Sequence, residues 1–339
     1  MTRVEQWIFV EQNDVGTLFH MAGLATPMAL RVAVTLGLPD RLDEGASAAL
    51  LAGELDVDPV ALELLLNHLV TVGVLDKTDD GYRTTAFGAH LRVDADNMLS
   101  NLLNLDNAGG RADQAFVELF HSVRTGRSAY EYRYGQDFWA DLAERPRLRE
   151  SFDRQMTQRF RAHVPRIVAG FDWSRFATVV DVGGGAGSLL AAILDAHPWM
   201  HGHLVDLEPT AAVARRTFLA RGLDERTRVI GGSFFDPLPA EADAYLLFDI
   251  LHNWDDEHAR RILGRCVEAV HSEGRILIIE GVGGRRATTE SDLAMLTIFG
   301  GRERRLDELR ALAEPQGLVL EGVTDLTDNR CLLEFSVAG

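Results

Sequence analysis

A glycine-rich turn between a predicted strand and a predicted helix constrains the fold of this 339-residue chain more than any other feature. Residues 178–182 have the β-branched sequence TVVDV, residues 183–187 follow with GGGAG, and residues 188–196 have an apolar helical pattern. Glycines let the backbone approach a ligand closely, and the first N–H groups of a helix have no partner inside it. The turn therefore predicts a cofactor site at the end of a strand.

The glycine run alone does not distinguish two classes of cofactor. The dinucleotide fingerprint G-x-G-x-x-G would place its third glycine at position 188, where this chain has Ser188. Asp206 ends the next predicted strand, where an acidic residue usually binds ribose hydroxyls in both classes. The pattern favours an adenosyl-type cofactor and leaves an NAD-dependent oxidoreductase as an alternative.

Strands and amphipathic helices alternate from residue 177 onward, which is typical of an α/β fold with a parallel sheet and helices on both faces. The predicted strands are 178–182, 203–207, 228–231, 244–247 and 275–280, and the predicted helices are 188–196, 209–221, 256–269 and 305–314. Two last apolar runs, 318–326 and 330–337, flank a turn of sequence TDN and predict a terminal antiparallel hairpin.

The N-terminal part has a different pattern. Helices are predicted at 26–36, 46–55 and 59–72, the last with Asp58 as N-cap and Pro59 in its first turn. Residues 74–77 and 82–85 flank DDG, which is a hairpin signal, so this part resembles a winged helix. We expect three parts: residues 1–100, a helical bridge over 101–170, and a cofactor-binding domain over 171–339.

Charge and composition narrow the possible partners. The net charge is -17, residues 1–100 hold six Lys/Arg against fifteen Asp/Glu, and the helix over 59–72 has no basic residue, so DNA binding is disfavoured. A regulator that senses an adenosyl ligand remains an alternative. We expect no run of about 20 apolar residues and no signal peptide at Met1 to Val10, hence a cytoplasmic protein without membrane partners. Cys266 and Cys331 are expected to be buried thiols without a metal.

Two further motifs follow predicted strands, FFDPLP at 234–239 after the third and LHNWDDE at 251–257 after the fourth, and GRILIIE at 274–280 lies on the fifth. With the glycine run, they make the sequence resemble the dimeric class I S-adenosylmethionine-dependent small-molecule O-methyltransferases, which include the caffeate and hydroxyindole enzymes. It is most similar to the bacterial members that tailor antibiotics such as anthracyclines. The resemblance runs nearly end to end. It implies a Rossmann-like methyltransferase sheet, a winged-helix dimerisation domain, a homodimer, no metal, and an aromatic natural product as methyl acceptor.

The resemblance also assigns residues to the cofactor S-adenosylmethionine, whose product is S-adenosylhomocysteine. The implied cofactor-binding residues are Arg149, Gly183, Gly185, Asp206, Leu207, Ser233, Phe234 and Phe248. Two of them depart from the family pattern, because relatives often have Asp at the position of Ser233 and Lys or Ser at that of Phe248.

The resemblance implies that His252 takes the proton of the acceptor hydroxyl, with Glu280 and Glu303 holding its imidazole. A phenol of pKa ~10 is a poor nucleophile while protonated, and an imidazole of pKa ~6.5 accepts a proton at neutral pH. The implied acceptor-binding residues are Trp139, Met156, Phe160, Asn253 and Met295, and Phe19, Met21 and Phe299 are further candidates for the pocket wall. Some relatives catalyse C-methylation, decarboxylation or hydroxylation instead, and these activities remain alternatives.

Overall fold

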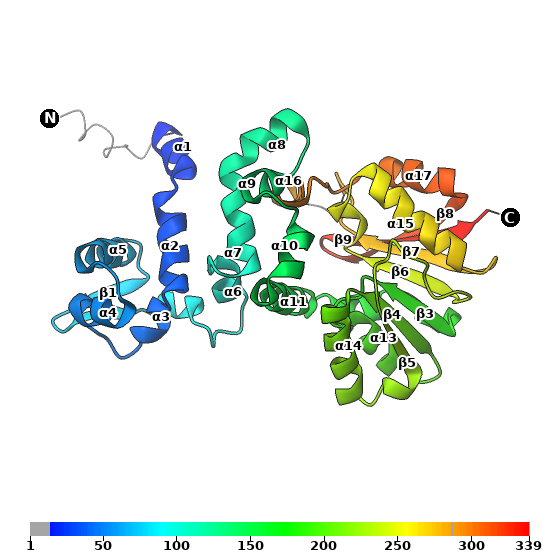
Figure 1. The fold of residues 1–339 in the computed structure, drawn as a ribbon, viewed down its shortest axis with the longest axis horizontal. Helices are drawn as coiled ribbons and strands as arrows, with labels where there is room; N and C mark the ends of the chain where they lie inside the picture. Colours follow the sequence, from blue (N-terminus) through cyan, green and yellow to red (C-terminus); the bar gives the residue numbers. More distant parts are fainter. Residues whose placement is uncertain (1–13, 286–287, 339) are drawn as a thin grey trace. The chain divides into compact units, whose positions relative to one another are not determined.

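The computed structural model describes residues 14–285 and 288–338, so the expectation about Met1 to Val10 lies outside the described residues. The chain divides into two compact units between Arg111 and Ala112, inside the segment for which the sequence predicted a helical bridge. Figure 1 shows the order of the elements along the chain.

The first unit contains the three predicted helices and the hairpin. Ser47 accepts a hydrogen bond from the Leu50 N–H at 3.2 Å, so α4 begins at Ala48 and not at residue 46. Ala46 instead pairs with Tyr82 of the hairpin. The elements of this unit are α1 (Asp14–Ala22), α2 (Ala25–Thr35), α3 (Leu38–Arg41), α4 (Ala48–Leu55), α5 (Pro59–Thr71), β1 (Leu75–Thr78), β2 (Gly81–Thr84), a 3₁₀ helix (Gly88–Leu91), α6 (Leu99–Leu103) and α7 (Ala108–Asp113), which crosses the boundary.

The predicted cap of α5 is confirmed: the Asp58 carboxylate accepts from the Ala61 N–H at 2.8 Å, and Pro59 opens the helix. Leu66 and Leu69 of this helix are fully buried in the core of the unit.

Among the described residues, the run Asp14–Thr35 is apolar enough, by length and composition alone, to cross a membrane. It is not a run of about 20 consecutive apolar residues, because Asp14, His20 and Arg31 lie within it, and it is divided between α1 and α2. Many of its apolar side chains are exposed, including Val15, Leu18 and Met21, so the run carries an exposed apolar surface.

The second unit opens with short helices and continues into a seven-stranded sheet. Before the sheet come a 3₁₀ helix (Gln114–Glu118), α8 (Leu119–Thr125), α9 (Ala129–Tyr134), α10 (Phe138–Glu144), α11 (Pro146–Phe160), α12 (Val164–Ala169) and a 3₁₀ turn (Trp173–Arg175). The sheet has the order β5-β4-β3-β6-β7-β9-β8, from β3 (Thr178–Val182), β4 (His201–Asp206), β5 (Thr227–Gly231), β6 (Ala244–Phe248), β7 (Arg275–Glu280), β8 (Leu318–Thr327) and β9 (Arg330–Val337).

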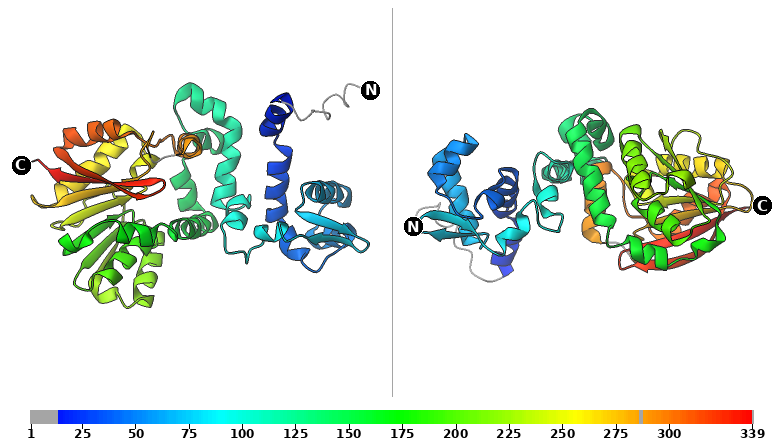
Figure 2. Two further views of the ribbon diagram at one scale, coloured as in Figure 1. Left: turned by 180° about the vertical axis from the view of Figure 1, so that it is seen from behind. Right: turned by 90° about the horizontal axis from the view of Figure 1, so that it is seen from below.

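The first five of these strands are parallel, and β8 and β9 form the predicted antiparallel hairpin at one edge, drawn in red in Figure 2. The predicted β4 was placed two residues too late. It begins at His201, which pairs with Thr178 of β3, and Leu207 lies beyond its end as the N-cap of α14.

Helices cover both faces of the sheet, as the fold class predicts (Figure 1). One core joins the sheet to α12, α13 (Ser188–Ala196) and α14 (Glu208–Ala220) through side chains such as Ile167, Leu190 and Phe218. The other joins it to α15 (Asp256–Ala269) and α17 (Leu306–Ala313) through Ile262 and Leu309. The helix α16 (Thr289–Phe299) was not predicted, and further 3₁₀ turns lie at Asp224–Arg226, Leu251–Asn253 and Glu314–Gln316.

Candidate active site

The site lies where the carboxyl ends of parallel strands meet. β3 pairs with β4 on one side and with β6 on the other, so the chain adds β4 and β5 on one side of β3 and then β6 and β7 on the other. In open α/β sheets, such a change of side leaves a crevice at the carboxyl ends of the strands, and ligands bind there. The ends of β4, β6 and β7 and the loops after β3 to β6 carry ten of the residues that the sequence selected: Gly183, Gly185, Asp206, Leu207, Ser233, Phe234, Phe248, His252, Asn253 and Glu280.

The glycine loop after β3 is shaped for close approach. Gly183 has φ 73°, and a Cβ there would lie 2.5 Å from Ile250 Cδ1, so any other residue would be strained and would displace the Ile250 side chain. Gly185 has φ 59°, yet a Cβ built on it meets no atom within 4 Å. The space above Gly185 is therefore open to a ligand, and α13 begins directly after the loop with its unpaired N–H groups.

Asp206 closes the same loop from the end of β4. Its Oδ2 accepts from the Gly185 N–H at 2.9 Å, and its Oδ1 accepts from the Leu207 N–H at 2.8 Å. Burial raises the pKa of Asp206 despite these two hydrogen bonds, and burial together with Asp206 raises the pKa of Asp181 to about 7. Each Asp206 oxygen keeps lone-pair capacity for a second donor, which suits a ligand diol.

The loop after β5 supplies an aromatic side chain to the crevice. A Cβ on Gly183 would lie 3.4 Å from Phe234 Cε1, so the Phe234 ring lies beside the glycine loop. The Ser233 hydroxyl oxygen accepts from the Phe235 N–H at 3.2 Å and stabilises this turn. Phe248, at the end of β6, packs its ring on Phe160 of α11, with centroids 4.4 Å apart. The structure thus joins a predicted cofactor residue, Phe248, to a predicted acceptor residue, Phe160.

Arg149 is a buried arginine of α11, with 6% of its surface exposed, so it is not a solvated surface charge. Its Nε atom has no hydrogen-bond partner among the described residues. The positive charge of Arg149 lowers the pKa of both Asp153 and Asp206. Burial has the larger effect, and it raises the pKa of Asp153 to about 6. A buried guanidinium with an unused donor near the glycine loop fits a carboxylate ligand, such as the one on the methionine part of the cofactor.

His252 lies in the 3₁₀ turn Leu251–Asn253 after β6 and is 3% exposed. Its backbone N–H donates to Glu280 Oε1 at 3.1 Å, and its Nδ1 lies 3.2 Å from Glu303 Oε1. Glu280 and Glu303 are 0% and 5% exposed, so neither is a surface residue. Because a carboxylate accepts the proton on Nδ1, the neutral ring keeps its lone pair on Nε2.

The charges around His252 favour its protonated form. Burial is the largest influence and lowers the pKa of His252, but the carboxylates of Glu303, Asp249 and Glu280 together outweigh it, and the net shift is upward. Burial raises the pKa of Glu280 to about 7. A proton taken up by His252 is therefore stabilised on the ring.

Arg304 is a residue of this site that sequence reasoning missed. Its guanidinium, 1% exposed, donates to the Leu251 and Trp254 carbonyl oxygens at 2.8 and 2.6 Å and thus spans the turn that carries His252. A Cβ on Gly301 would lie 2.0 Å from the His252 carbonyl oxygen, so the loop before Arg304 packs directly on the same turn. The neighbouring Glu303 was the only signal in the sequence for this segment.

An aromatic cluster lies beside the turn. The Trp139 ring stacks on Phe299 at 5.3 Å and is nearly parallel to Trp254 at 6.3 Å. Phe138 and Phe152 meet Trp139 edge to face.

The other predicted acceptor residues come from three elements. Met295 of α16 is buried, Met156 of α11 is half-buried, and the Asn253 amide donates to the Asp249 carbonyl oxygen at 3.0 Å. Phe19 and Met21 lie in the other unit and are exposed there.

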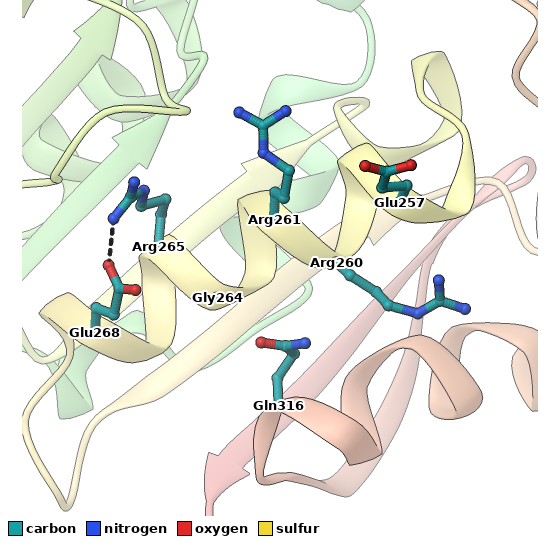
Figure 3. A pocket seen from close by; sticks show the side chains of 7 residues that line it. All are labelled: Glu257, Arg260, Arg261, Gly264, Arg265, Glu268 and Gln316. Carbon is teal, nitrogen blue, oxygen red and sulfur yellow. Dashed lines mark hydrogen bonds and ion pairs between the residues drawn. The ribbon is translucent and has the colours of Figure 1, made fainter.

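A hollow of about 400 Å³ lies along α15, away from these residues. Figure 3 shows Arg260 and Arg261 pointing to different sides of the helix, and Arg265 paired with Glu268. The Arg261 guanidinium lies over the Phe235 ring at 4.8 Å. The walls of this hollow are Gly264, Gln316 and five charged side chains, and they include none of the residues that the sequence selected, so we do not place the active site there. Cys266 and Cys331 are buried thiols, as predicted, and the described residues contain no group of three or more His, Cys, Asp or Glu side chains arranged to hold a metal.

Comparison with known proteins identifies the family. Residues 116–319 match the O-methyltransferase domain, and residues 18–94 match the O-methyltransferase dimerisation domain. The 2,7-dihydroxy-5-methyl-1-naphthoate 7-O-methyltransferase of Streptomyces carzinostaticus is 47% identical over 88% of this chain and 91% of its own. Aclacinomycin 10-hydroxylase RdmB of Streptomyces purpurascens is 42% identical over 94% and 89%.

A solved structure covers nearly the whole chain. The O-methyltransferase NcsB1 from neocarzinostatin biosynthesis, in complex with S-adenosyl-L-homocysteine and 1,4-dihydroxy-2-naphthoic acid, has a TM-score of 0.90 and 43% identity over 97% of this chain and 100% of its own. Of the two cofactor classes that the glycine run allowed, these comparisons confirm S-adenosylmethionine and not NAD. The chain therefore belongs to the O-methyltransferase family and is an enzyme that transfers the methyl group of S-adenosylmethionine to a hydroxyl group.

Proposed function

We propose that this enzyme methylates a phenolic hydroxyl of a bulky aromatic secondary-metabolite intermediate, with His252 as the general base. The observation that carries the proposal is the buried His252 with its Nδ1 on the Glu303 carboxylate. This contact directs Nε2 toward the acceptor and stabilises the imidazolium ion that forms when the hydroxyl loses its proton. Glu280 supports the same turn through the His252 N–H.

The cofactor would be held by residues of the strand ends. Gly183 and Gly185 would lie against its methionine part, Asp206 would accept the ribose hydroxyls, and Arg149 would bind the methionine carboxylate. Leu207, Ser233, Phe234 and Phe248 are the remaining proposed contacts, with the Phe234 ring beside the adenine. When bound, S-adenosylmethionine supplies a methyl group on a positively charged sulfur, so the protein need only position the acceptor oxygen and remove its proton.

The acceptor would lie against the aromatic cluster. Trp139 offers a flat apolar face in contact with Phe299, and Met156, Phe160, Asn253 and Met295 are proposed to complete the wall. Flat aromatic side chains select flat aromatic ligands by stacking. Two relatives act on or bind naphthoic acids by their names, which agrees with a fused-ring hydroxy acid as substrate class.

The test is methyl transfer from S-adenosylmethionine to a panel of fused-ring phenols, beginning with 1,4-dihydroxy-2-naphthoic acid. We expect His252→Gln to lower kcat by about 10²–10⁴-fold, with unchanged calorimetric binding of S-adenosylhomocysteine. His258→Gln is the matched control, because His258 lies six residues further along the chain, in α15, with its side chain 38% exposed. A kcat of His252→Gln within about threefold of wild type would refute His252 as the base.

One relative gives a specific reason to examine other chemistry. RdmB, 42% identical, is named as a hydroxylase, and C-methylation or decarboxylation by relatives was also left open by the sequence. Mass spectrometry of the product separates these outcomes, since O-methylation and C-methylation add CH₂, hydroxylation adds oxygen and decarboxylation removes CO₂. Protection of the product's hydroxyl from acetylation identifies O-methylation, the outcome we expect.

We also propose that residues 1–100 form a winged-helix dimerisation domain and that residues 101–170 bridge it to the catalytic domain at 171–339. We propose that the enzyme is a homodimer. We further propose that it is cytoplasmic and has no nucleic-acid or membrane partners. The match of residues 18–94 to the dimerisation domain and the exposed apolar side chains of α1 and α2 support the dimer. Light scattering should give twice the chain mass of 37.4 kDa, and the monomer mass would count against it.

A further inference from the structure

Asp249 has an unusual backbone conformation directly before the turn that carries His252. Its φ is 53°, in the left-handed region that few residues other than glycine adopt. Its N–H donates to the Ile279 carbonyl oxygen at 2.9 Å, and its own carbonyl oxygen accepts from the Asn253 amide at 3.0 Å. The backbone of Asp249 is thus held from both sides, at a local cost in energy that the surrounding structure offsets.

The Asp249 side chain forms a buried ion pair with Arg330, the first residue of β9. Arg330 Nε lies 2.6 Å from Asp249 Oδ1, Arg330 Nη2 donates to Oδ2 at 2.8 Å, and the two side chains are 4% and 5% exposed. Burial alone would raise the pKa of Asp249, but the charges of Arg330, His252 and Arg159 outweigh burial, and the net shift is downward. The pair is therefore charged. Burial of two charges costs desolvation free energy, which only their mutual attraction and their hydrogen bonds can offset.

The pair belongs to a group of charges that face His252 from every element around it. The carboxylates of this group raise the pKa of His252, and Arg330 in turn is influenced by Asp249, Glu303 and Glu280. Arg159 of α11 acts on Asp249, and Asp292 of α16 accepts from the Glu303 N–H at 3.1 Å. The charged and titratable groups that interact with His252 or with the pair are Glu280 of β7, Glu303 of the loop after α16, Arg159 of α11 and His163, which precedes α12.

We propose that Asp249 and Arg330 are a positioning pair that holds the His252 turn in place and balances the charge beneath it, so that His252 begins each reaction as a neutral base. This inference rests on the proposed role of His252. Neither residue touches the reacting atoms. Asp249 acts on His252 through the turn and through its charge, and Arg330 pairs with the Asp249 carboxylate and so offsets the charge that it places near the imidazole.

The test is the pH dependence of kcat/KM, whose acid limb follows the protonation of the base. Asp249→Asn removes the negative charge and leaves Arg330, and Asn tolerates the left-handed backbone. The acid limb should therefore move to lower pH. At a pH on the acid limb of wild type, kcat/KM of the variant, taken as a fraction of its own plateau, should be about threefold or more above the same fraction for wild type. The double variant Asp249→Asn with Arg330→Gln removes both charges, and its limb should return toward that of wild type.

Asp141→Asn is the matched control, because Asp141 is a fully buried acid of α10 that accepts from Gln136 and pairs with Arg145. Its limb should stay in place. If Asp249→Asn lowers the rate equally at all pH values, or moves the limb upward, the pair is only structural and the inference is overturned. If wild type has no acid limb, or His252→Gln retains it, the proposed base fails as well, so the two failures are distinguishable.

Discussion

Arg304→Met is the substitution whose effect follows most directly from the geometry of the active-site turn. Methionine keeps most of the length of the side chain and removes the guanidinium that spans the Leu251 and Trp254 carbonyl oxygens. Both carbonyl oxygens would lose a charged donor in a site where Arg304 is 1% exposed, so water does not replace it freely. The turn that carries His252 would then lose one of its attachments to the loop of Glu303, while the contact of His252 with Glu303 would remain.

The magnitude follows from the bonds lost. A hydrogen bond from a charged donor contributes about 1.5–3 kcal/mol, and two buried ones are lost. The third bond, to Asp256 at 3.0 Å, adds less than about 1 kcal/mol because that carboxylate is 44% exposed. We expect a loss of about 3–5 kcal/mol in the free energy of unfolding, which lowers the Tm by about 10 °C. A displacement of His252 by about 1 Å would also lower kcat about 100-fold.

Arg305→Met is the control in the same loop. Arg305 pairs with Asp307, but the two side chains are 64% and 70% exposed, so its loss should change the stability by less than about 0.5 kcal/mol. Urea denaturation and initial rates of methyl transfer measure both variants. The reasoning is refuted if Arg304→Met loses less than about 1 kcal/mol of stability and keeps a kcat within about threefold of wild type.

Three further predictions concern the base, the acceptor wall and the glycine loop. Glu303→Gln removes the carboxylate on His252 Nδ1, so kcat should fall about tenfold or more and the acid limb of the pH–rate profile should move to lower pH; an unmoved limb would contradict the contact. Trp139→Ala removes the stack with Phe299, so the KM for an aromatic acceptor should rise about tenfold while calorimetry gives an unchanged Kd for S-adenosylhomocysteine; equal losses in both would place Trp139 elsewhere. Burial raises the pKa of Asp181 from 3.8 to about 7, so the native state keeps a proton that the unfolded state releases. The stability that this proton contributes is present below about pH 4 and is lost as pH rises through about 7. Chemical denaturation of Asp181→Asn should therefore lack the decline in stability that wild type shows between about pH 4 and pH 7, and parallel curves for the two proteins would show that burial does not hold this proton.

The parts of this enzyme that were predictable from sequence are those encoded by local patterns. The strand TVVDV followed by GGGAG, the Asp58 cap of α5 and the turn between β8 and β9 each depend on a few neighbouring residues, and the structure has each of them. Errors fell at element ends, where tertiary pairing decides. His201 joins β4 because its N–H donates to Ala177 across the sheet at 2.8 Å, a bond that no local pattern announces.

The helix α16 and the charged network around His252 were missed for a different physical reason. α16 has apolar residues without a clear stripe, because its buried Met295 and Thr297 face helices distant in sequence. Arg304, Asp249 and Arg330 look like ordinary charged residues in the sequence, and only the fold removes them from water. Glu303 was found through a family resemblance, and its burial could not be inferred from its glycine-rich, charged neighbours.

The network explains why a buried base needs distant partners. A buried imidazole is a poor proton acceptor by itself, because burial disfavours the imidazolium ion. The carboxylates of Glu303 and Glu280 stabilise the imidazolium ion and so offset the effect of burial. Each added carboxylate also raises the pKa of His252, and too many of them would hold the ring protonated before the acceptor binds. We propose that the buried Arg330 opposes that excess through its ion pair with Asp249. The sheet suits this arrangement because the carboxyl ends of β6 and β7 and the amino end of the antiparallel strand β9 meet at one edge, which brings Asp249, Glu280 and Arg330 to the same place.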